Sequence, residues 1–188
     1  MKIPRVIFKT RVGDHESLGG GCAIGGAWKN VSTDDLFKGK RVVVFSLPGA
    51  YTPTCSSQQV PGYEEKYEAL KAQGIDEVYC VSVNDSFVMN AWFRSQNITK
   101  VKPIADGEGK LTEGMGMLVN KPGQGFGMRS WRYSAVVDNG EAIKMFIEAG
   151  RNDESNDNDP YIQSTPETML EYLKKIGSLK KSQSRRSE

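Results

Sequence analysis

Two continuous apolar segments constrain the fold of this chain more than any other feature. Arg41–Leu47 (RVVVFSL) is one such run, and Glu77–Val83 (EVYCVSV) is the other. Runs of this kind are typical of strands that are buried on both faces of a parallel sheet. A helical segment follows each run, at Thr52–Ala72 and at Asp85–Gln96. The sequence therefore predicts an α/β domain whose central strands run parallel.

The remaining segments indicate how this core is extended. Asn139-Gly140 between apolar stretches is a strong hairpin signal, and Pro61-Gly62 is expected to kink or break the long helix. The other expected elements are strands at Ile3–Thr10 and Val101–Ala105, a loop at Gly13–Gly26, short helices at Ser32–Phe37 and Thr112–Leu118, a loop at Pro122–Gly127, the hairpin strands Trp131–Val137 and Ala142–Ile147, an acidic loop at Asn152–Pro160 and a last helix at Thr165–Ile176. This order is that of the thioredoxin fold, an α/β fold, with an N-terminal β extension.

The length of 188 residues corresponds to one domain. We expect a folded domain over residues 1–177 and a basic, disordered tail over residues 178–188. The tail accounts for more than the whole formal net charge of +2, so the rest of the chain is slightly acidic. A body of this kind carries no electrostatic footprint for nucleic acid, and we expect no nucleic-acid partner.

Composition and termini favour a cytoplasmic protein with no bound cofactor. No segment approaches the about 20 apolar residues of a membrane span, so no membrane partner is expected. The first ten residues lack the apolar region and cleavage site of a secretory signal. The 3 cysteines do not make a disulfide framework, and free thiols favour a reducing compartment. With 1 histidine and no C-x-x-C pair, the common zinc sites are excluded and no metal is expected.

The turn between the first apolar strand and its helix carries the most chemical information. It reads Pro48–Cys55 (PGAYTPTC) and follows the carboxyl end of a strand, where sites form in open α/β sheets. Thr52 suits the helix N-cap and Pro53 the first helical position, so Cys55 falls at the third. The unpaired N–H groups and the positive end of the helix dipole favour a thiolate there, although a buried structural cysteine is the alternative.

At this point the sequence resembles a known family. Pro48-x-x-x-Thr52-x-x-Cys55 matches the P-x-x-x-T-x-x-C signature of peroxiredoxins, and LPGAYTPTCSSQQVPGYEE is similar to their type II (atypical) branch. FSLPGAYTPTCSS, VSVNDSFVMNAW, EGMGMLV and FGMRSWRYS resemble the peroxidase half of bacterial glutaredoxin-fused hybrid peroxiredoxins. The resemblance extends from about Ile3 to Ile176 and implies the peroxiredoxin type of thioredoxin fold.

The resemblance also implies roles for individual residues. Cys55 would be the peroxidatic cysteine, whose thiolate attacks hydrogen peroxide or an alkyl hydroperoxide and becomes a sulfenic acid. Thr52 would offer its hydroxyl to the thiolate or the peroxide, and Pro48 would shield the sulfur from water. The family takes a cation from a later strand, and Arg132 in RSWRYS is our candidate, with Arg129 as a rim arginine and rival. Strand alternation places Arg132 on the face of Ser134 and Val136.

The return of the sulfenic acid to the thiol admits two cycles. Cys80 follows Cys55 at the spacing of plant type II enzymes, where the corresponding cysteine is the resolving one. A cysteine in the middle of a central strand is, however, poorly placed to meet one at a helix start, and a structural role for Cys80 is favoured. We therefore expect a one-cysteine cycle with glutathione as electron donor and glutaredoxin as partner. The alternative is a Cys55–Cys80 disulfide that thioredoxin reduces.

Several further features of the sequence have more than one interpretation. The family implies a homodimer formed near the active-site loops. Met115, Met117 and Phe126 are candidates to line the peroxide pocket and meet a partner subunit, with core packing as the alternative for the two methionines. A non-enzymatic redox-sensing binding protein is an alternative function, whereas a thioredoxin-type disulfide reductase would need the C-x-x-C pair. We expect Cys22 to be an incidental loop thiol and His15 a solvated turn residue. Asp153, Glu154, Asp157 and Asp159 lack the spacing of a calcium loop and are expected to form a solvated acidic loop.

Overall fold

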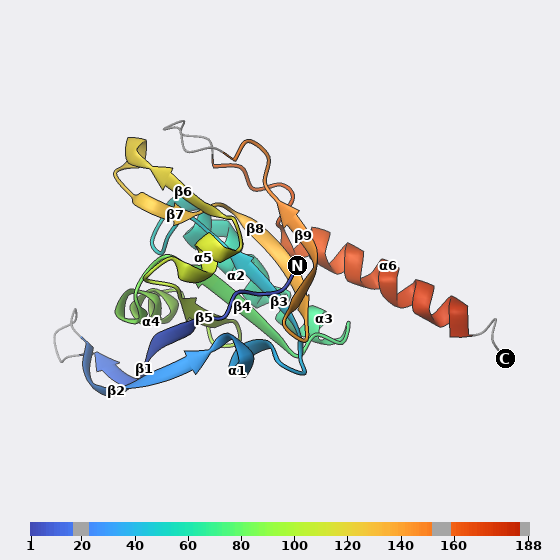
Figure 1. Cartoon of the computed structure of the whole chain (residues 1–188), viewed down its shortest axis with the longest axis horizontal. Helices are drawn as coiled ribbons and strands as arrows, with labels where there is room; N and C mark the ends of the chain where they lie inside the picture. Colours follow the sequence, from blue (N-terminus) through green and yellow to red (C-terminus); the bar gives the residue numbers. More distant parts are fainter. Residues whose placement is uncertain (17–22, 152–158, 185–188) are drawn as a thin grey trace.

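The fold is built on one mixed sheet of 5 strands in the order β5-β4-β3-β8-β9. This computed structural model describes residues 1–16, 23–151 and 159–184 (Figure 1). The sheet strands are β3 (Arg41–Ser46), β4 (Glu77–Ser82), β5 (Lys102–Ala105), β8 (Tyr133–Asp138) and β9 (Glu141–Ile147). The arrangement is a thioredoxin-like α/β fold, as the sequence predicts.

The two apolar runs form the centre of the sheet. Strands β3 and β4 are parallel neighbours, with Val43 opposite Val78 and Phe45 opposite Cys80. Every residue of β4 is buried, because β3 and β5 pair with its two edges and apolar layers cover both faces. Each run is therefore a strand enclosed on both faces, which confirms the prediction.

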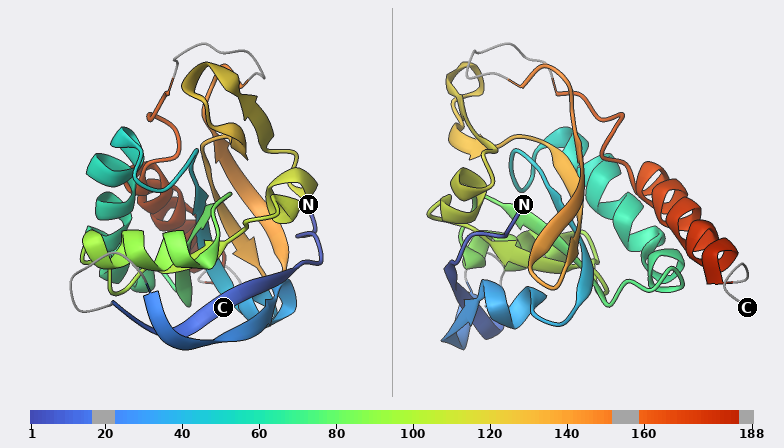
Figure 2. Two further views of the ribbon diagram at one scale, coloured as in Figure 1. Left: turned by 90° about the vertical axis from the view of Figure 1, so that its left-hand side faces the viewer. Right: turned by 45° about the vertical axis from the view of Figure 1, so that its right-hand side comes forward.

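Helices and loops cover the sheet in two layers (Figure 2). One face packs against the helices α2 (Val60–Glu65), α3 (Tyr67–Lys71), α4 (Ser86–Ser95) and α6 (Pro166–Ser184). The other face packs against α1 (Thr33–Phe37), α5 (Lys110–Gly114) and the first residues of the chain. Cys55 and Cys80 belong to the first layer, so both cysteines lie on the face covered by α2, α3, α4 and α6.

The predicted hairpin joins β8 to β9. Its turn is Asn139-Gly140, with φ values of 47° and 78°. Two successive residues with positive φ define the turn type that matches the twist of antiparallel strands, and Gly140 adopts this conformation without steric cost. The hairpin places β8 beside β3, with Ser134 opposite Phe45, so residues that precede β8 come near the end of β3.

The N-terminal part differs from the expected strand and loop. Strands β1 (Ile7–Glu16) and β2 (Ala23–Ser32) pair antiparallel, so most of Gly13–Gly26 is a ladder rather than a loop. Glycines such as Gly13 and Gly26, with φ values of 72° and 69°, interrupt the alternation of side chains that would indicate a strand. The two strands still pair, because the ladder consists of backbone hydrogen bonds that do not depend on the side chains. His15 belongs to β1 rather than to a turn, whereas Cys22 lies outside the described residues.

The region before the hairpin also differs from the prediction. The helix expected over Thr112–Leu118 is the shorter α5, and the chain then enters β6 (Leu118–Lys121), which pairs with β7 (Gly127–Ser130). Gly116 follows α5 with a φ of 70°, a conformation that ends a helix. Part of the loop expected over Pro122–Gly127 is a short 3₁₀ turn, η2 (Pro122–Gln124).

The last helix is longer than the sequence indicates. Thr165 caps it by accepting a hydrogen bond from the Thr168 N–H at 3.2 Å, as predicted. The helix then continues past Ile176 to Ser184, because Leu, Lys and Gln in this stretch favour helix. Much of the tail expected to be disordered is therefore helical, and α6 projects from the body (Figure 1). None of the described helices is both long and apolar enough to cross a membrane.

Candidate active site

The segment that carries Cys55 begins with an ordinary helical turn and then widens. The Thr52 carbonyl accepts a hydrogen bond from the Ser56 N–H at 3.0 Å, which makes Thr52 the first residue of the helix start. Cys55–Gln59 is a π-helical turn, η1, and the Val60 N–H bonds back to the Cys55 carbonyl. Pro61 has no N–H for the Ser57 carbonyl and would crowd it, and the wider turn relieves this clash.

The expected break in the long helix is therefore displaced. Pro61 and Gly62 lie inside α2, and the irregular points are the π turn before them and Lys66 after them. Proline is tolerated near the start of a helix because its missing N–H has no partner there in any case. The sequence correctly indicates that Pro61 disrupts the helix. The observed disruption, however, lies one turn before Pro61, among the residues that surround Cys55.

Thr52 occupies the expected place with a different hydrogen bond. Its hydroxyl donates to the Gly49 carbonyl at 2.8 Å instead of capping the helix through its side chain. The single hydroxyl proton is thereby used, and the oxygen keeps lone pairs that can accept a hydrogen bond from a peroxide. Pro48, which is buried, lines the same pocket as Thr52.

Cys55 and Arg132 meet in the interior of the protein. The sulfur of Cys55 is completely buried, and Nη1 of Arg132 donates to it at 3.5 Å. Arg132 directly precedes β8, and its side chain is 1% exposed. Ser134 and Val136 are both buried, and Val136 packs in the layer of Cys55, while Tyr133, Ala135 and Val137 pack in the opposite layer. The predicted strand alternation is thus observed.

The Arg132 guanidinium is held from several directions. Nη1 also donates to Oε1 of Gln59, and Nη2 forms an ion pair with Asp159. Burial lowers the pKa of Arg132, but the charges of Cys55 and Asp159 outweigh burial and raise it above its ordinary value. Within the part of the chain that the structure describes, Nε has no hydrogen-bond partner. The group is therefore a fixed cation with a donor left for another molecule.

Arg129, the rival of Arg132, lies elsewhere. Its Nη1 donates to the Val83 carbonyl at 2.9 Å and its Nε to the Phe126 carbonyl at 3.1 Å. Burial lowers its pKa. These contacts give Arg129 a structural role at the rim, and of the two arginines it is Arg132 that contacts the sulfur.

Gln59 is a site residue that the sequence analysis missed. Its Nε2 donates to the Ser46 carbonyl at 3.3 Å, which orients Oε1 toward Arg132. The residue is completely buried although it follows a polar run, SSQ. Its position four residues after Cys55 was the available signal, because residues at this spacing share one side of a helix.

The segment after the acidic loop forms a wall behind Arg132. Buried Glu148, just after β9, accepts hydrogen bonds from the N–H groups of Ile162, Gln163 and Ser164 at 2.8–2.9 Å. The ring of Tyr161 lies 5.6 Å from the guanidinium carbon. The sequence predicts that Asp159 is a solvated loop residue, and its ion pair with Arg132 shows that this prediction is wrong. The other three acidic residues of that loop, Asp153, Glu154 and Asp157, lie outside the described residues.

A pocket of about 320 Å³ opens beside the buried cysteine. Its wall includes Pro48, Thr52, Thr54, Lys121, Phe126 and Asp159. Lys121 is buried, its Nζ lies 4.8 Å from the ring of Trp131, and burial lowers its pKa. Met115 and Met117 belong to the apolar core on the other side of the sheet, so of the three candidates only Phe126 lines this pocket.

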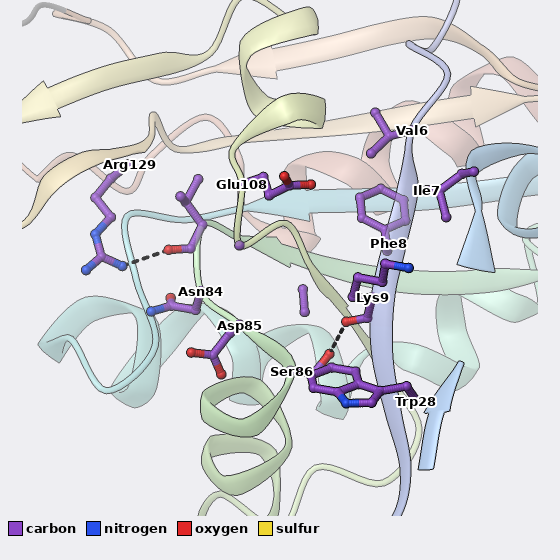
Figure 3. Close-up of a pocket in the computed structure, with 13 residues that line it drawn as sticks. Val6, Ile7, Phe8, Lys9, Trp28, Asn84, Asp85, Ser86, Glu108 and Arg129 are labelled. Atoms are coloured by element: carbon purple, nitrogen blue, oxygen red, sulfur yellow. Dashed lines mark hydrogen bonds between the residues drawn. The ribbon is translucent and has the colours of Figure 1, made fainter. Parts of the chain in front are cut away.

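A second pocket, of about 420 Å³, lies between β1 and the start of α4 (Figure 3). Lys9, Trp28, Asn84 and Glu108 are among its lining residues, and Arg129 stands at its edge. The Ser86 hydroxyl donates to the Lys9 carbonyl at 2.7 Å and fixes this wall. The smaller pocket is the candidate active site, because Pro48 and Thr52 of the turn before Cys55 and Asp159, which pairs with Arg132, line it and do not line the larger pocket.

Cys80 lies closer to this site than the sequence suggests. It is completely buried in β4 between Phe45 and Pro103, and it shares an apolar cluster with Cys55. Burial raises the pKa of the Cys80 thiol, and the charge on Cys55 adds to this rise. Both cysteines are free thiols. Cys80 is thus a neutral neighbour of the site within the core.

Comparisons with known proteins agree with the fold and show the family. The profile of the redoxin family matches residues 23–160. A peroxiredoxin of Rhizobium etli is 51% identical over 173 residues, which cover 92% of this chain and 94% of that protein. A hybrid peroxiredoxin of Haemophilus influenzae is 48% identical over 172 residues, 92% of this chain but 64% of its own.

A solved structure supports the same assignment. The Plasmodium falciparum antioxidant protein, described as a 1-Cys peroxiredoxin, is 37% identical and superposes with a TM-score of 0.84, covering 93% of this chain and 98% of its own. The chain therefore belongs to the redoxin family and, within it, to the type II-like peroxiredoxins. It is a thiol-dependent peroxidase.

Proposed function

We propose that Cys55 is the peroxidatic cysteine and that it reduces hydrogen peroxide and small alkyl hydroperoxides. Its thiolate attacks one peroxide oxygen, so that an S–O bond forms while the O–O bond breaks. The departing oxygen keeps the electron pair and takes the peroxide proton, leaving as water or an alcohol, and Cys55 becomes a sulfenate. The observation that carries this proposal is the 3.5 Å contact between Arg132 Nη1 and the buried sulfur.

The surrounding groups support each part of this step. The Arg132 cation favours the thiolate and stabilises charge that develops along the breaking O–O bond. Its Nε, which has no partner among the described residues, supplies a further donor. The Thr52 hydroxyl oxygen can accept a hydrogen bond from the peroxide O–H, because its own proton is donated to the Gly49 carbonyl. Pro48 helps to keep bulk water from the sulfur, as expected from its place in the pocket wall.

For the return of Cys55 to the thiol, we propose a one-cysteine cycle. Glutathione attacks the sulfenic acid, water leaves, and glutaredoxin or a second glutathione resolves the mixed disulfide. Two features support this proposal. Cys80 lies inside a sheet strand whose edges are both paired, and its thiol is held neutral by burial. The similar Plasmodium protein is described as a 1-Cys enzyme.

A two-cysteine cycle with thioredoxin is the second candidate, and one observation favours it. Cys55 and Cys80 belong to one apolar cluster, and the charge on Cys55 contributes to the raised pKa of Cys80. A Cys55–Cys80 disulfide would therefore need less movement than their places at a helix start and in a strand imply. A non-enzymatic sensor, in contrast, would react with peroxide once and show no continuing consumption.

A peroxidase assay with alternative reductants tests these cycles. Wild type, Cys55→Ser and Cys80→Ser are each supplied with glutathione plus glutaredoxin, or with thioredoxin and its reductase. We expect Cys55→Ser to be inactive with both systems and Cys80→Ser to keep most of the glutathione-linked activity. Activity with thioredoxin alone that Cys80→Ser abolishes would establish the two-cysteine cycle instead.

We also propose a cytoplasmic homodimer formed at the active-site end. Tyr51, Phe87 and Met128 are exposed apolar side chains on loops and elements near this end, with 57%, 40% and 49% exposure. Their burial against a second copy of the chain would remove apolar surface from water, which supports the proposal. Sedimentation of wild type and Tyr51→Glu tests the assembly: we expect a dimer for wild type and a weakened one for the variant, and a monomeric wild type would contradict it.

A further inference from the structure

Asp159 touches both the Arg132 guanidinium and the substrate pocket. Its Oδ1 is paired with Nη2 of Arg132, and the carboxylate lies on the pocket wall, where its side chain is 39% exposed. The proposed chemistry of Cys55 uses the arginine but assigns nothing to this carboxylate. A carboxylate paired with the arginine that contacts the sulfur offsets part of the arginine's positive charge, so its presence at this place calls for a physical reason.

The fold holds Asp159 at this position by several fixed contacts. The chain after it is fastened by Glu148, whose Oε1 accepts three backbone N–H bonds and the Ser164 hydroxyl at 2.8 Å. The backbone of Glu148 in turn bonds to the Arg132 carbonyl at 3.2 Å. The same strand end therefore fixes both the arginine and the segment that begins with Asp159.

The charges around the pocket balance one another. Among the described side chains in or next to the pocket, Arg132 and Lys121 carry positive charges, while Asp159 and the Cys55 thiolate carry negative charges. Lys121 and Arg132 are both buried, so bulk solvent screens their charges only weakly. With Asp159 in place the reactive site is nearly neutral, and without it the pocket would present a net positive charge to a substrate.

We propose that Asp159 is a specificity-determining residue that makes the pocket select neutral hydroperoxides over hydroperoxides that carry a carboxylate. Such an anion would meet the Asp159 charge at the pocket wall and would find Arg132 already paired. A neutral hydroperoxide meets neither obstacle. This assignment rests on the proposed function, in which Cys55 reduces the peroxide that enters this pocket.

The test compares a hydroperoxide that carries a carboxylate with its methyl ester, which is neutral and larger by one methyl group; the effect of the methyl group is common to wild type and variant. The measured quantity is the ratio of their kcat/KM values, for wild type and Asp159→Asn. A change in the thiolate fraction, or in its intrinsic reactivity, affects both substrates alike and cancels in this ratio. We expect Asp159→Asn to raise the ratio of acid to ester about tenfold at low salt, and the gain to shrink as salt is added.

Three further variants separate a local effect from a general one. Asp159→Glu keeps the charge and is expected to leave the ratio near that of wild type. Lys121→Met removes a pocket cation and should lower the ratio. Glu68→Gln changes the net charge as Asp159→Asn does, but at a carboxylate on α3 that is 72% exposed, and should have no effect.

Each remaining outcome is decisive. If Asp159→Asn leaves the ratio unchanged, or if Glu68→Gln raises it equally, Asp159 does not determine specificity. If wild type consumes neither hydroperoxide, the proposed function itself fails, which is a different result. A ratio that rises in Asp159→Asn, falls in Lys121→Met and returns in Asp159→Glu establishes the role.

Discussion

The guanidinium of Arg132 donates from Nη1 to the sulfur of Cys55 across 3.5 Å, although 77 positions separate the two residues in the chain. The contact joins the start of β8 to the turn that follows β3. It exists because β3 and β8 are hydrogen-bonded neighbours and because the π turn directs the sulfur inward. The reactivity that we propose for Cys55 therefore depends on the pairing of the sheet as well as on its own helix start.

Replacing Arg132 is expected to remove most of the peroxidase activity. In Arg132→Met the thiolate loses its cation and the breaking O–O bond loses a donor, and kcat/KM for hydrogen peroxide should fall about 10²–10³-fold. Arg132→Lys keeps the positive charge but lacks the forked guanidinium geometry, so its kcat/KM should lie between those of wild type and Arg132→Met. Stopped-flow kinetics with peroxide measures both values.

Arg129→Met is the matched control for this experiment, because Arg129 donates to two backbone carbonyls away from the sulfur. We expect its kcat/KM to remain within a few-fold of wild type. An Arg132→Met protein that reacts with peroxide as fast as Arg129→Met would contradict the role of Arg132.

The covalent state of the protein after one turnover distinguishes the two cycles directly. Reduced protein is mixed with one equivalent of hydrogen peroxide and then with glutathione, and its intact mass is measured. We expect a glutathione adduct on Cys55 in wild type and in Cys80→Ser. Loss of two hydrogens without an adduct, seen in wild type and absent from Cys80→Ser, would show an internal disulfide and exclude the one-cysteine cycle.

Acid should destabilise the protein partly through Glu64 on α2. Burial raises the pKa of Glu64, but hydrogen bonds from the N–H groups of Val101, Thr99 and Lys100 outweigh it and hold the pKa below its ordinary value of 4.5. A carboxyl group with a depressed pKa in the folded state contributes stability above its unfolded pKa, and this contribution is lost as the pH falls through the folded value.

Urea denaturation from pH 7 downward tests this contribution. Glu64→Gln should be less stable than wild type by about 1 kcal/mol at pH 7 and should lose less stability on acidification. Glu68→Gln, with its carboxylate 72% exposed on the next helix, serves as control and should follow the wild-type profile. Parallel pH profiles for wild type and Glu64→Gln would refute the assignment.

Replacing Gly140 or Gly177 with alanine should change the stability of the protein in opposite directions. At Gly140 a Cβ would meet no atom within 4 Å, but φ is 78°, so Gly140→Ala should cost about 1–2 kcal/mol from backbone strain alone. Gly177 lies within α6 with equally open space. Gly177→Ala should stabilise the protein by about 0.5–1 kcal/mol through helix propensity. Thermal or urea denaturation measures both, and equal signs would contradict this reading.

Local patterns in the sequence predict the centre of the fold well. The apolar runs of β3 and β4, the Asn139-Gly140 turn and the alternation around Arg132 each have a short-range physical cause, and each is observed. The β1–β2 ladder is missed because glycines interrupt its side-chain pattern while the backbone pairing continues through them. The end of α6 is missed because polar helix-forming residues resemble a solvated tail.

The polar half of the site is harder to predict, because its contacts join distant parts of the chain. Asp159 meets Arg132 across 27 positions, and Glu148 reaches Ser164 across 16. An acidic residue in a polar stretch carries no local sign of such a partner. Gln59 differs, since its helical spacing from Cys55 places it on the same side of the turn and was available in the sequence.

The complete enclosure of the Cys55 sulfur divides the catalytic cycle into two unequal halves. Hydrogen peroxide is little larger than water and needs only a small displacement to reach the sulfur. A reductant larger than water has no such route, so we expect regeneration to wait until the polypeptide opens. The turnover rate should then reach a maximum as the reductant concentration rises. That maximum would equal the rate at which this chain opens and would not depend on which reductant is used.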